Sequence, residues 1–518
     1  MKREEVITKI NSQNIWDILV IGGGATGLGI ALEACTRGYS TLLVEQADFA
    51  KSTSGKSTKL VHGGVRYLAQ GNLSLVREAT VERGLLSKNA PHLVKNQTFI
   101  IPVYSWWSRL KYTMGLKLYD WISGRLSLGS SVFISRKKVL EKLPGIVPKH
   151  LFGGILYHDG QFDDARLAIN LAQTIFDNGG YAINYMKVDS LLKNDGKLYG
   201  VVVSDAETSE QFALRSKAVI NATGVFADDI LKMDNPGAKK NIALSQGVHL
   251  VLDKKFFPGK DALMIPETSD GRVLFIVPWH DRLLVGTTDT PVQDITLEPV
   301  ALETEIEFIL HTATTYLTLT PKREDVLSVF AGLRPLASSE GKGNPTKEIS
   351  RSHKIMISPS KLFTMLGGKW TTYRKMGEDM IDKVEKELGW KQTITTTGSL
   401  RIHGFTAQVI SGDPLYYYGS DIISVNKIIN ETGNEWASEK LNIRKAQVLW
   451  SIREEMARTV EDILSRRTRA LLLDSKESIA IAPVVAAIMA QEMSRDSNWI
   501  EAQVKSYNEV AKNYVIST

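Results

Sequence analysis

The sequence predicts an α/β protein that opens with a nucleotide-binding βαβ unit and closes with a helical region. Residues 16–21 (WDILVI) form a short apolar run bounded by glycines, which is typical of a buried strand. Residues 25–38 repeat apolar side chains at near-helical spacing, and residues 40–44 (STLLV) form a second apolar run. Charged helical segments dominate after Thr397, so we expect a domain boundary near residue 390.

A glycine fingerprint joins the first strand to the first helix. Residues 22–27 read GGGATG, a G-x-G-x-x-G, and Glu45 stands at the end of the second strand. In such a unit Gly22 permits the tight turn, Gly24 lets a pyrophosphate approach, and Gly27 lets helix and strand pack. The helix N-terminus stabilises the phosphates, and Glu45 accepts hydrogen bonds from the adenosine ribose. The combination predicts dinucleotide binding rather than an unliganded glycine turn.

Helical and β-rich patterns alternate between this unit and the helical region. The expected elements, in chain order, are helix 72–89, a helix within 156–180, antiparallel strands within 181–214, buried strand 218–222, a β-rich stretch 243–289, helix 302–319, strand-then-glycine patterns at 330–336 and 362–374, helix 376–388, and further helices that include 440–473.

The composition is that of an ordinary globular protein with roughly two to four domains. The single cysteine, Cys35, excludes an intrachain disulfide and fits a reducing compartment. Residues 1–14 lack the apolar core of a secretory signal, and no apolar run reaches the ~18–20 residues of a spanning helix. The longest such run, residues 479–490, contains Pro483 and is expected to be a buried helix.

The net charge of +6 and the pI of about 9.0 are mildly basic. The lysines and arginines are scattered, and no nucleic-acid recognition motif accompanies them, so we expect no nucleic-acid partner. An acidic membrane surface or a phosphorylated substrate explains the charge equally well.

Residues 57–68 (STKLVHGGVRYL) point to an anionic substrate. They place Lys59, His62 and Arg66 around a glycine pair, just beyond the fingerprint. Paired glycines let a backbone approach a flat ring system or adopt a positive φ. Two later segments favour FAD over NAD: residues 221–224 (NATG) and 367–369 (GGK) each follow a strand and would return the chain to the cofactor.

These motifs occur together in one order that resembles the FAD-dependent, quinone-linked glycerol-3-phosphate dehydrogenases. The resemblance rests on the fingerprint, STKLVHGGVRYL, NATG, VGTTDT (285–290), AGLRPL (331–336), EISRSH (348–353), GGKWTTYRK (367–375) and ARTVEDILSRRTRALLLD (457–474), and it covers nearly the whole chain.

The resemblance implies a Rossmann-like FAD-binding domain of the glycine-oxidase or D-amino-acid-oxidase type, a β-rich substrate domain and a C-terminal helical cap, an α/β and α+β architecture. The corresponding ranges are residues 1–90, 151–240 and 330–390 for the FAD-binding domain, 91–150 and 241–329 for the substrate and membrane-facing domain, and 391–518 for the helical domain.

The same resemblance implies that glycerol 3-phosphate is oxidised to dihydroxyacetone phosphate, with a hydride passing to FAD and electrons to ubiquinone or menaquinone. Arginine suits a phosphate ester because its planar fork donates two parallel hydrogen bonds. By carry-over, Arg66, Tyr67, Arg351 and Thr372 bind the substrate, and Arg334, Lys369 and His62 are the catalytic candidates. The general base stays open between His62, Lys369 and a water. His249 is expected to be either a core residue or a residue of the active-site wall.

The FAD contacts implied by the resemblance are Gly22, Gly24, Gly27, Glu45, Thr53, Ser54, Ser57, Lys59, Leu60, Lys369, Trp370 and Thr371. The loop departs from the family pattern at residues 55–58 (GKST), where small residues are commoner. Val225 and Phe226 replace the usual Pro-Trp after NATG, which we interpret as a packing change.

Residues 104–122 (YSWWSRLKYTMGLKLYDWI) predict an interfacial membrane helix. At helical spacing, Trp107, Leu110, Met114, Leu118 and Trp121 fall on one face, flanked by Lys111 and Lys117. A quinone is confined to lipid, so its reductase must meet the bilayer. We therefore expect a peripheral protein on the cytoplasmic face of the inner (plasma) membrane, with an anionic membrane surface as partner and a homodimer as a compatible assembly. The alternative is a core-facing helix in a cytoplasmic protein.

Three other functions stay open at this point. A soluble glycerol-3-phosphate oxidase would pass electrons to oxygen and make hydrogen peroxide. An amine or amino-acid oxidase could use the same fold, although it would not need so many phosphate-type donors. A non-catalytic nucleotide-binding membrane protein would carry no flavin.

Overall fold

The expected βαβ unit forms the centre of the first of two mixed sheets. In this computed structural model, which describes residues 1–64, 72–124, 127–268, 271–337, 353–408 and 412–516, β1 (Trp16–Ile21) leads through α2 (Ala25–Thr36) to β2 (Thr41–Val44). β1 pairs in parallel with β2 and with β10 (Gln211–Asn221), and β10 pairs in parallel with β18 (Leu362–Leu366). The carboxyl ends of these strands therefore meet at one edge of the sheet, where open α/β sheets bind ligands.

Further strands extend this sheet on both sides. Its path runs β17-β18-β10-β1-β2-β7, and β8 and β9 continue from β10 as an antiparallel extension, which confirms the small antiparallel sheet expected after residue 181. The added strands are β7 (Tyr181–Ile183), β8 (Met186–Asn194), β9 (Lys197–Asp205) and β17 (Lys354–Ile357).

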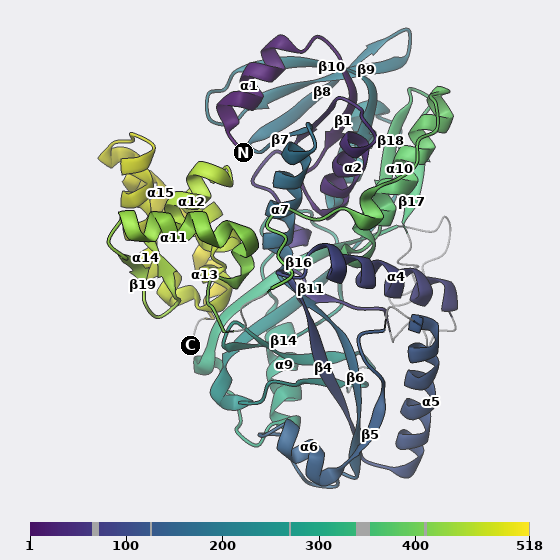
Figure 1. Cartoon of the computed structure of the whole chain (residues 1–518), viewed down its shortest axis with the longest axis vertical. Helices are drawn as coiled ribbons and strands as arrows, with labels where there is room; N and C mark the ends of the chain where they lie inside the picture. The colour runs from purple at the N-terminus through teal and green to yellow at the C-terminus, as the bar shows by residue number, and fades with distance from the viewer. Residues whose placement is uncertain (65–71, 125–126, 269–270, 338–352, 409–411, 517–518) are drawn as a thin grey trace.

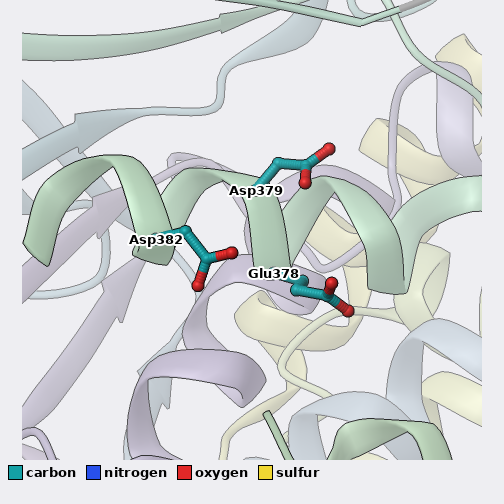
Figure 2. A group of neighbouring side chains, drawn as sticks. All are labelled: Glu378, Asp379 and Asp382. Atoms are coloured by element: carbon teal, nitrogen blue, oxygen red, sulfur yellow. The ribbon is translucent and has the colours of Figure 1, made fainter. Parts of the chain in front are cut away.

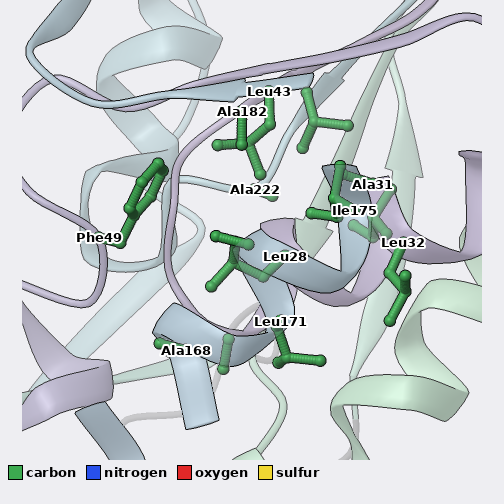
Figure 3. Packing of buried hydrophobic residues seen from close by; sticks show 14 of the residues in the cluster. Leu28, Ala31, Leu32, Leu43, Phe49, Ala168, Leu171, Ile175, Ala182 and Ala222 are labelled. Carbon is green, nitrogen blue, oxygen red and sulfur yellow. The ribbon is translucent and has the colours of Figure 1, made fainter. Parts of the chain in front are cut away.

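Two helices pack tightly on the first sheet. Figure 3 shows apolar side chains of α2 meeting those of α7 (Asp164–Asp177) and of the strands. A third helix, α10 (Tyr373–Leu388), crosses α2 so closely that a Cβ on Gly29 would lie 2.6 Å from the carbonyl oxygen of Tyr373. The reverse also holds, because a Cβ on Gly377 would lie 2.5 Å from the Gly29 carbonyl oxygen. Glycine at both positions lets the helix backbones touch.

The second sheet lies below the first in Figure 1 and contains the expected β-rich stretch. Its path runs β15-β11-β14-β13-β12-β4-β6-β3, with β16 paired to β11 and β5 paired to β6. The strands are β3 (Leu60–Val61), β4 (Val94–Val103), β5 (Val132–Ser135), β6 (Gly153–Phe162), β11 (Ile242–Asp253), β12 (Ala262–Ile265), β13 (Leu274–Trp279), β14 (Arg282–Gly286), β15 (Thr290–Val292) and β16 (Val326–Ala337).

Three of these strands come from ranges that the sequence grouped with the FAD-binding domain, namely β3, β6 and β16. The chain therefore crosses between the two sheets several times, and the proposed domain ranges stay a prediction. The expected helices 72–89 and 302–319 are present. The helices beside the sheets are α1 (Arg3–Ser12), α4 (Leu73–Asn89), α5 (Trp106–Ser123), α6 (Arg136–Lys142), α8 (Ala227–Asp234) and α9 (Glu303–Tyr316).

The C-terminal region is largely helical, as expected, and Figure 1 draws it in yellow-green beside both sheets. The expected helical segments within 440–473 are short, because the chain turns at Met456 and Arg469, which have positive φ. The expected helix at 479–490 lies within α14, but it is buried on one face only, since Val484 on the other face is 45% exposed. The elements are α11 (Ile422–Glu431), β19 (Trp436–Ser438), β20 (Ile443–Arg444), α12 (Lys445–Glu454), the π-helical turn Asp462–Arg467, α13 (Ala470–Leu473), α14 (Ser475–Glu492), α15 (Ser497–Ala511) and the turn Lys512–Tyr514.

Among the described helices, none combines the length and the apolar character that a bilayer crossing requires.

Candidate functional site

A cavity of about 690 Å³ lies where the carboxyl ends of β1, β2, β10 and β18 meet the second sheet. Both NATG and GGK border it, as their position after parallel strands predicts. The sequence-predicted residues that line this cavity are Gly22, Gly24, Glu45, Thr53, Ser54, Ser57, Leu60, His62, Arg334, Lys369, Trp370 and Thr371.

The fingerprint glycines have the geometry that dinucleotide binding requires. Gly22 has a φ of +109°, and a Cβ there would lie 2.7 Å from the Ala222 carbonyl oxygen. Gly27 lies behind the cavity wall, because a Cβ on it would lie 1.8 Å from the Gly22 carbonyl oxygen. It therefore serves helix–strand packing rather than direct contact. The N-terminus of α2 opens at Gly24, where backbone N–H groups are available to phosphates.

Glu45 closes the turn from the other strand. Its carboxylate accepts hydrogen bonds from the backbone N–H groups of Gly23, at 2.6 Å, and Ala47, at 2.9 Å. Burial raises the pKa of Glu45, while these two N–H groups oppose that shift. The side chain is thus held at the end of β2, in the place where an adenosine ribose is bound in such units.

Residues 48–58, which we call the cofactor loop, cross the cavity from β2 toward β3. Ser54 Oγ accepts a hydrogen bond from the Ala25 N–H at 2.9 Å, so the loop covers the start of α2. Thr53 Oγ1 donates to the Leu333 carbonyl at 2.6 Å, and Trp370 Nε1 donates to the Ser54 carbonyl at 2.8 Å. The loop therefore binds both Leu333, which precedes Arg334, and Trp370, which follows Lys369.

Among the described residues, Lys59 and Thr372 join Gly27 as predicted site residues that do not line the cavity. Lys59 is fully buried, and its ammonium donates to Asp164 Oδ1 at 2.7 Å and to the Gly55 carbonyl at 2.8 Å. This ion pair anchors the end of the cofactor loop to α7, so the expected direct FAD contact of Lys59 has no support from its placement. Thr372 is also buried, with its hydroxyl turned toward the Lys369 carbonyl at 3.4 Å, and the expected substrate contact likewise has no such support.

Arg334 is held rigidly at the cavity wall. Its guanidinium donates to the Thr288 carbonyl at 3.1 Å and to Thr287 Oγ1 at 3.0 Å, and it lies 3.7 Å from the Asp289 carboxylate. A Cβ on Gly247 would lie 2.1 Å from Arg334 Nη2, so the glycine leaves room for the guanidinium. Three acceptors on residues 287–289 orient this cation, which is what precise recognition of an oxygen-rich anion needs.

Two histidines border the cavity with different environments. His62 lines it directly after β3. His249 is buried in the wall, stacked on Phe330 with ring centres 5.0 Å apart, and its Nε2 lies 2.9 Å from Thr58 Oγ1. Burial, together with the charges of Arg334 and Lys59, lowers the pKa of His249 well below its usual value, so this ring is neutral at physiological pH.

The structure adds charged residues that no motif in the sequence marks, among them Arg272 and Asp159. Arg272 precedes β13 and lines the cavity, with its guanidinium 5.5 Å from the centre of the Phe308 ring. Asp159 of β6 also lines it and is compensated by Arg83, 2.8 Å away. The place of each residue in the cavity depends on the assembly of the second sheet and could not be predicted from a local motif. The predicted substrate residues Arg66, Tyr67 and Arg351 lie outside the described residues.

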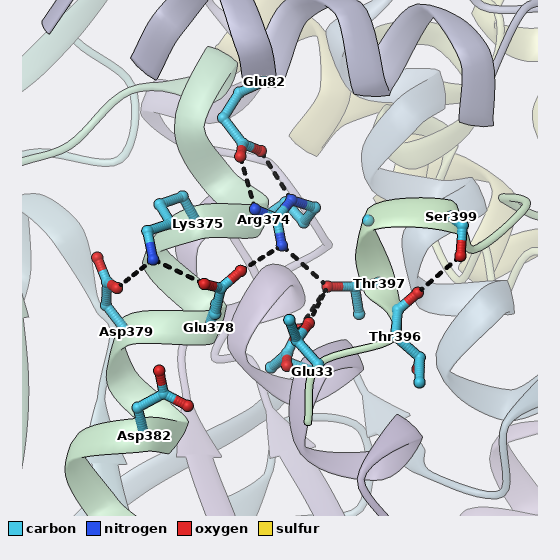
Figure 4. Close-up of polar contacts among 12 residues, drawn as sticks. Glu33, Glu82, Arg374, Lys375, Glu378, Asp379, Asp382, Thr396, Thr397 and Ser399 are labelled. Carbon is cyan, nitrogen blue, oxygen red and sulfur yellow. Dashed lines mark hydrogen bonds and ion pairs between the residues drawn. The ribbon is translucent and has the colours of Figure 1, made fainter. Parts of the chain in front are cut away.

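An acidic group on α10 stands apart from the cavity. Glu378, Asp379 and Asp382 gather their carboxylates within 4.8 Å of one another (Figure 2). Arg374 donates to Glu378 at 2.6 Å and also to Glu82 of α4, while Lys375 lies 2.8 Å from Asp379 (Figure 4). Asp382 pairs with Arg37 at 2.7 Å. Each carboxylate thus has a basic partner, and the group ties α10 to its neighbours.

Comparison with known proteins agrees with this geometry. Residues 17–367 match the family model described as FAD dependent oxidoreductase, and residues 363–500 match the C-terminal domain of alpha-glycerophosphate oxidase. The mitochondrial glycerol-3-phosphate dehydrogenase of Bos taurus is 37% identical over 554 residues, covering 99% of this chain and 75% of the relative. The chain belongs to the FAD-dependent glycerol-3-phosphate dehydrogenase family.

Other members of this family and fold extend the comparison. The mitochondrial glycerol-3-phosphate dehydrogenase of Schizosaccharomyces pombe is 34% identical, covering 99% of this chain and 89% of the relative. The glycerol-3-phosphate dehydrogenase of Bacillus halodurans, solved in complex with FAD, matches with a TM-score of 0.81 at 30% identity, over 99% of this chain and 98% of that one. Glycine oxidase from Bacillus cereus shares the fold, with a TM-score of 0.52 at 18% identity over 76% of this chain and 100% of that one.

These findings confirm the predicted family, the glycine-oxidase type of fold and FAD as the cofactor. The residues present fit FAD: a glycine turn that a Cβ would fill, a helix N-terminus facing the cavity, and a carboxylate at the end of β2. Their individual contacts with the cofactor stay predictions.

Proposed function

We propose that the protein oxidises sn-glycerol 3-phosphate to dihydroxyacetone phosphate and passes the electrons to a membrane quinone. The observation that carries the substrate assignment is Arg334, fixed by the Thr287 hydroxyl and the Thr288 carbonyl at the wall of the FAD cavity. Lys369 and Arg272 add cationic side chains to the same cavity. Because Arg83 compensates the Asp159 carboxylate, this acid does not oppose the binding of a dianionic phosphate ester.

The chain's own residues would divide the chemistry as follows. Bound FAD supplies the acceptor for the hydride that leaves C2 of the substrate. Arg334 would orient the C2 hydroxyl group, and its fixed acceptors keep it from turning away. The hydroxyl proton must leave as the C2 oxygen becomes a carbonyl oxygen, and His62, Lys369 or a water would accept it. The cofactor loop would cover the site and exclude bulk water.

Anaerobic addition of glycerol 3-phosphate to the FAD-loaded protein tests the substrate. We expect loss of the flavin absorbance near its oxidised maximum, with glycerol and glycine as non-reducing controls. Bleaching by glycine with none by glycerol 3-phosphate would favour an amino-acid oxidase and refute the proposal. Purification of a colourless protein that takes up no FAD would favour a non-catalytic role.

The outer face of α5 supports a membrane as the site of electron transfer. Its apolar stripe is exposed rather than packed, with Trp107 at 74%, Met114 at 64% and Trp121 at 79% of full exposure. Arg109, Lys111 and Lys117 are exposed on the same helix. Exposed aromatic side chains among cations suit the headgroup region of an anionic bilayer. This arrangement supports a peripheral membrane protein, and we propose that it lies on the cytoplasmic face of the plasma membrane, where it would reach ubiquinone or menaquinone.

A soluble oxidase is the second candidate, because residues 363–500 match the C-terminal domain of alpha-glycerophosphate oxidase. Parallel assays of hydrogen peroxide formation and of reduction of a quinone analogue separate the two acceptors. Stoichiometric peroxide with no quinone reduction would overturn the quinone proposal. The homodimer also stays a prediction, which measurement of the molar mass by light scattering would test.

A further inference from the structure

The helix α5 has a buried face as well as the exposed one. Leu116 and Tyr119 point away from solvent and are 1% and 2% exposed, whereas Trp121, two residues further on, is 79% exposed. In Figure 1 the helix stands at the lower right, beside β5 and below α4. One side of α5 is thus available to a bilayer while the other packs on the protein.

Tyr119 is the polar group on that buried face. Its hydroxyl accepts hydrogen bonds from Arg83 Nη1 at 2.8 Å and from the backbone N–H of Gly63 at 3.1 Å, and it donates to Asp159 Oδ2 at 3.1 Å. Burial raises the pKa of Tyr119 well above its usual value, so the phenol keeps the proton that it donates. The four groups form a closed network that joins α4, α5, β6 and the segment that follows β3.

The Gly63 contact reaches the catalytic cavity. Gly63 directly follows His62, which lines the cavity. Asp159, which also accepts a hydrogen bond from the Gly63 N–H at 3.3 Å, lines the cavity as well. A Cβ on Gly63 would lie 2.2 Å from the Tyr119 hydroxyl oxygen and 2.5 Å from the Thr80 methyl group. The backbone beside His62 therefore rests directly on the Tyr119 side chain.

We propose that Tyr119 is a positioning residue that couples the docking of α5 on an anionic lipid surface to the His62–Gly63 wall of the catalytic cavity. The proposal deepens the proposed function and rests on it. It assigns α5 a part in substrate binding in addition to attachment.

The packing explains why a displacement of α5 would reach the cavity. A buried, close-packed network with few free rotamers transmits a shift of one element instead of absorbing it. The hydrogen bonds around Tyr119 are also mutually dependent, because Arg83 and Asp159 are charged and almost without solvent. A bilayer that favours one position of α5 would therefore favour one position of the His62 backbone.

Tyr119→Phe tests the coupling, with Tyr112→Phe as the matched control. Tyr112 lies two turns earlier on α5, and its ring packs on the neighbouring core. Activity is measured on the FAD-loaded protein with a water-soluble dye as electron acceptor, with and without phosphatidylglycerol vesicles. The dye bypasses the quinone, so the assay reports the glycerol 3-phosphate reaction alone.

We expect vesicles to change the KM for glycerol 3-phosphate in the wild type and in Tyr112→Phe. Tyr119→Phe should sediment with the vesicles normally and lose that response. Its KM should rise about two- to tenfold, the equivalent of losing the one hydrogen bond, with the Gly63 N–H, that joins Tyr119 to the cavity wall. A Tyr119→Phe protein with the KM and the vesicle response of the control would overturn the coupling. A wild type that binds vesicles with no change in KM would also overturn it.

Failure of the underlying function would look different. A wild type that does not sediment refutes membrane docking, and one whose flavin is not bleached refutes the substrate; either result overturns the coupling too. If Tyr119→Phe does not fold, amide hydrogen exchange of residues 60–64 in the wild type decides. Altered protection on vesicles supports the coupling, and unchanged protection refutes it.

Discussion

The Lys51 ammonium lies 2.8 Å from the Glu461 carboxylate and joins the cofactor loop to the C-terminal helical region. Two further links flank this pair. Asp48 is buried between Arg466 and Arg467, and Lys56 contacts both Glu298 and the hydroxyl of Tyr514. The helical region thus contacts the cofactor loop, which covers the FAD cavity, at Asp48, Lys51 and Lys56. These contacts give the helical region a role in cofactor retention.

Glu461→Gln should weaken the attachment of the cofactor loop to the C-terminal helical region. Burial alone would raise the pKa of Glu461, but Arg466 and Lys51 lower it to about 2, so the group is ionised at neutral pH. Its neutralisation should cost about 2 kcal/mol of stability and speed FAD release. Thermal unfolding and loss of flavin on gel filtration measure both effects. Glu501→Gln, which alters an exposed carboxylate on α15, is the control and should change neither.

Gly247→Ala should disable substrate handling while sparing the fold. The added methyl group would lie 2.1 Å from Arg334 Nη2 and would push the guanidinium off its acceptors. We expect kcat/KM for glycerol 3-phosphate to fall by about tenfold or more, with a normal flavin spectrum. Gly115→Ala is the control, since a Cβ there meets no atom within 4 Å. Equal kinetics in the two variants would contradict the assigned role of Arg334.

His62→Asn separates the candidate bases. If His62 accepts the hydroxyl proton, the rate of anaerobic flavin reduction should fall by about 10²-fold or more, and the pH dependence of that rate should lose its lower limb. A variant that keeps the wild-type rate and pH profile would leave Lys369 or a water as the acceptor. His249→Asn offers a comparison, because this buried ring is neutral and hydrogen-bonded to Thr58.

Polar substitution of the exposed tryptophans should release the protein from membranes. Trp107→Ser combined with Trp121→Ser removes two large apolar groups from the outer face of α5, and vesicle affinity should fall by about tenfold or more. Dye-linked activity in the absence of vesicles should persist. Ile394→Ser, at a side chain that is 89% exposed elsewhere, is the control. Unchanged sedimentation of the double variant would argue for a different membrane contact.

His403 predicts a loss of stability at alkaline pH. Burial alone would lower its pKa, but the carboxylates of Asp177, at 2.7 Å, and Asp421, at 3.1 Å, raise it to about 9. Because folding raises the pKa of His403, the protonated ring stabilises the folded protein. This stabilisation is complete at pH values below the unfolded-state pKa of about 6.5 and is lost as the pH rises through about 9. His403→Asn should remove on the order of 2 kcal/mol at pH 6 and little above pH 10. Unfolding by denaturant at both pH values checks the difference.

Local patterns were sufficient to predict much of the cofactor site. Gly22 and Gly24 of the fingerprint, Glu45 and the strand-end segments NATG and GGK all border one cavity. Their role follows from strand direction and glycine spacing, both of which are encoded within a few residues. The long-range partners were not predictable in this way. Lys59 looked like a cofactor ligand, yet it pairs with Asp164, 105 residues away.

The sequence by itself determined the βαβ unit, the family and the apolar stripe of α5, because each depends on residue types at short, regular spacing. Only the tertiary structure decided that the apolar stripe of α5 faces outward, that Arg272 and Asp159 line the cavity, and that the helical region contacts the cofactor loop. The reason is physical: periodicity shows which face of an element is apolar, but the packing of distant segments determines what covers that face and which charges meet.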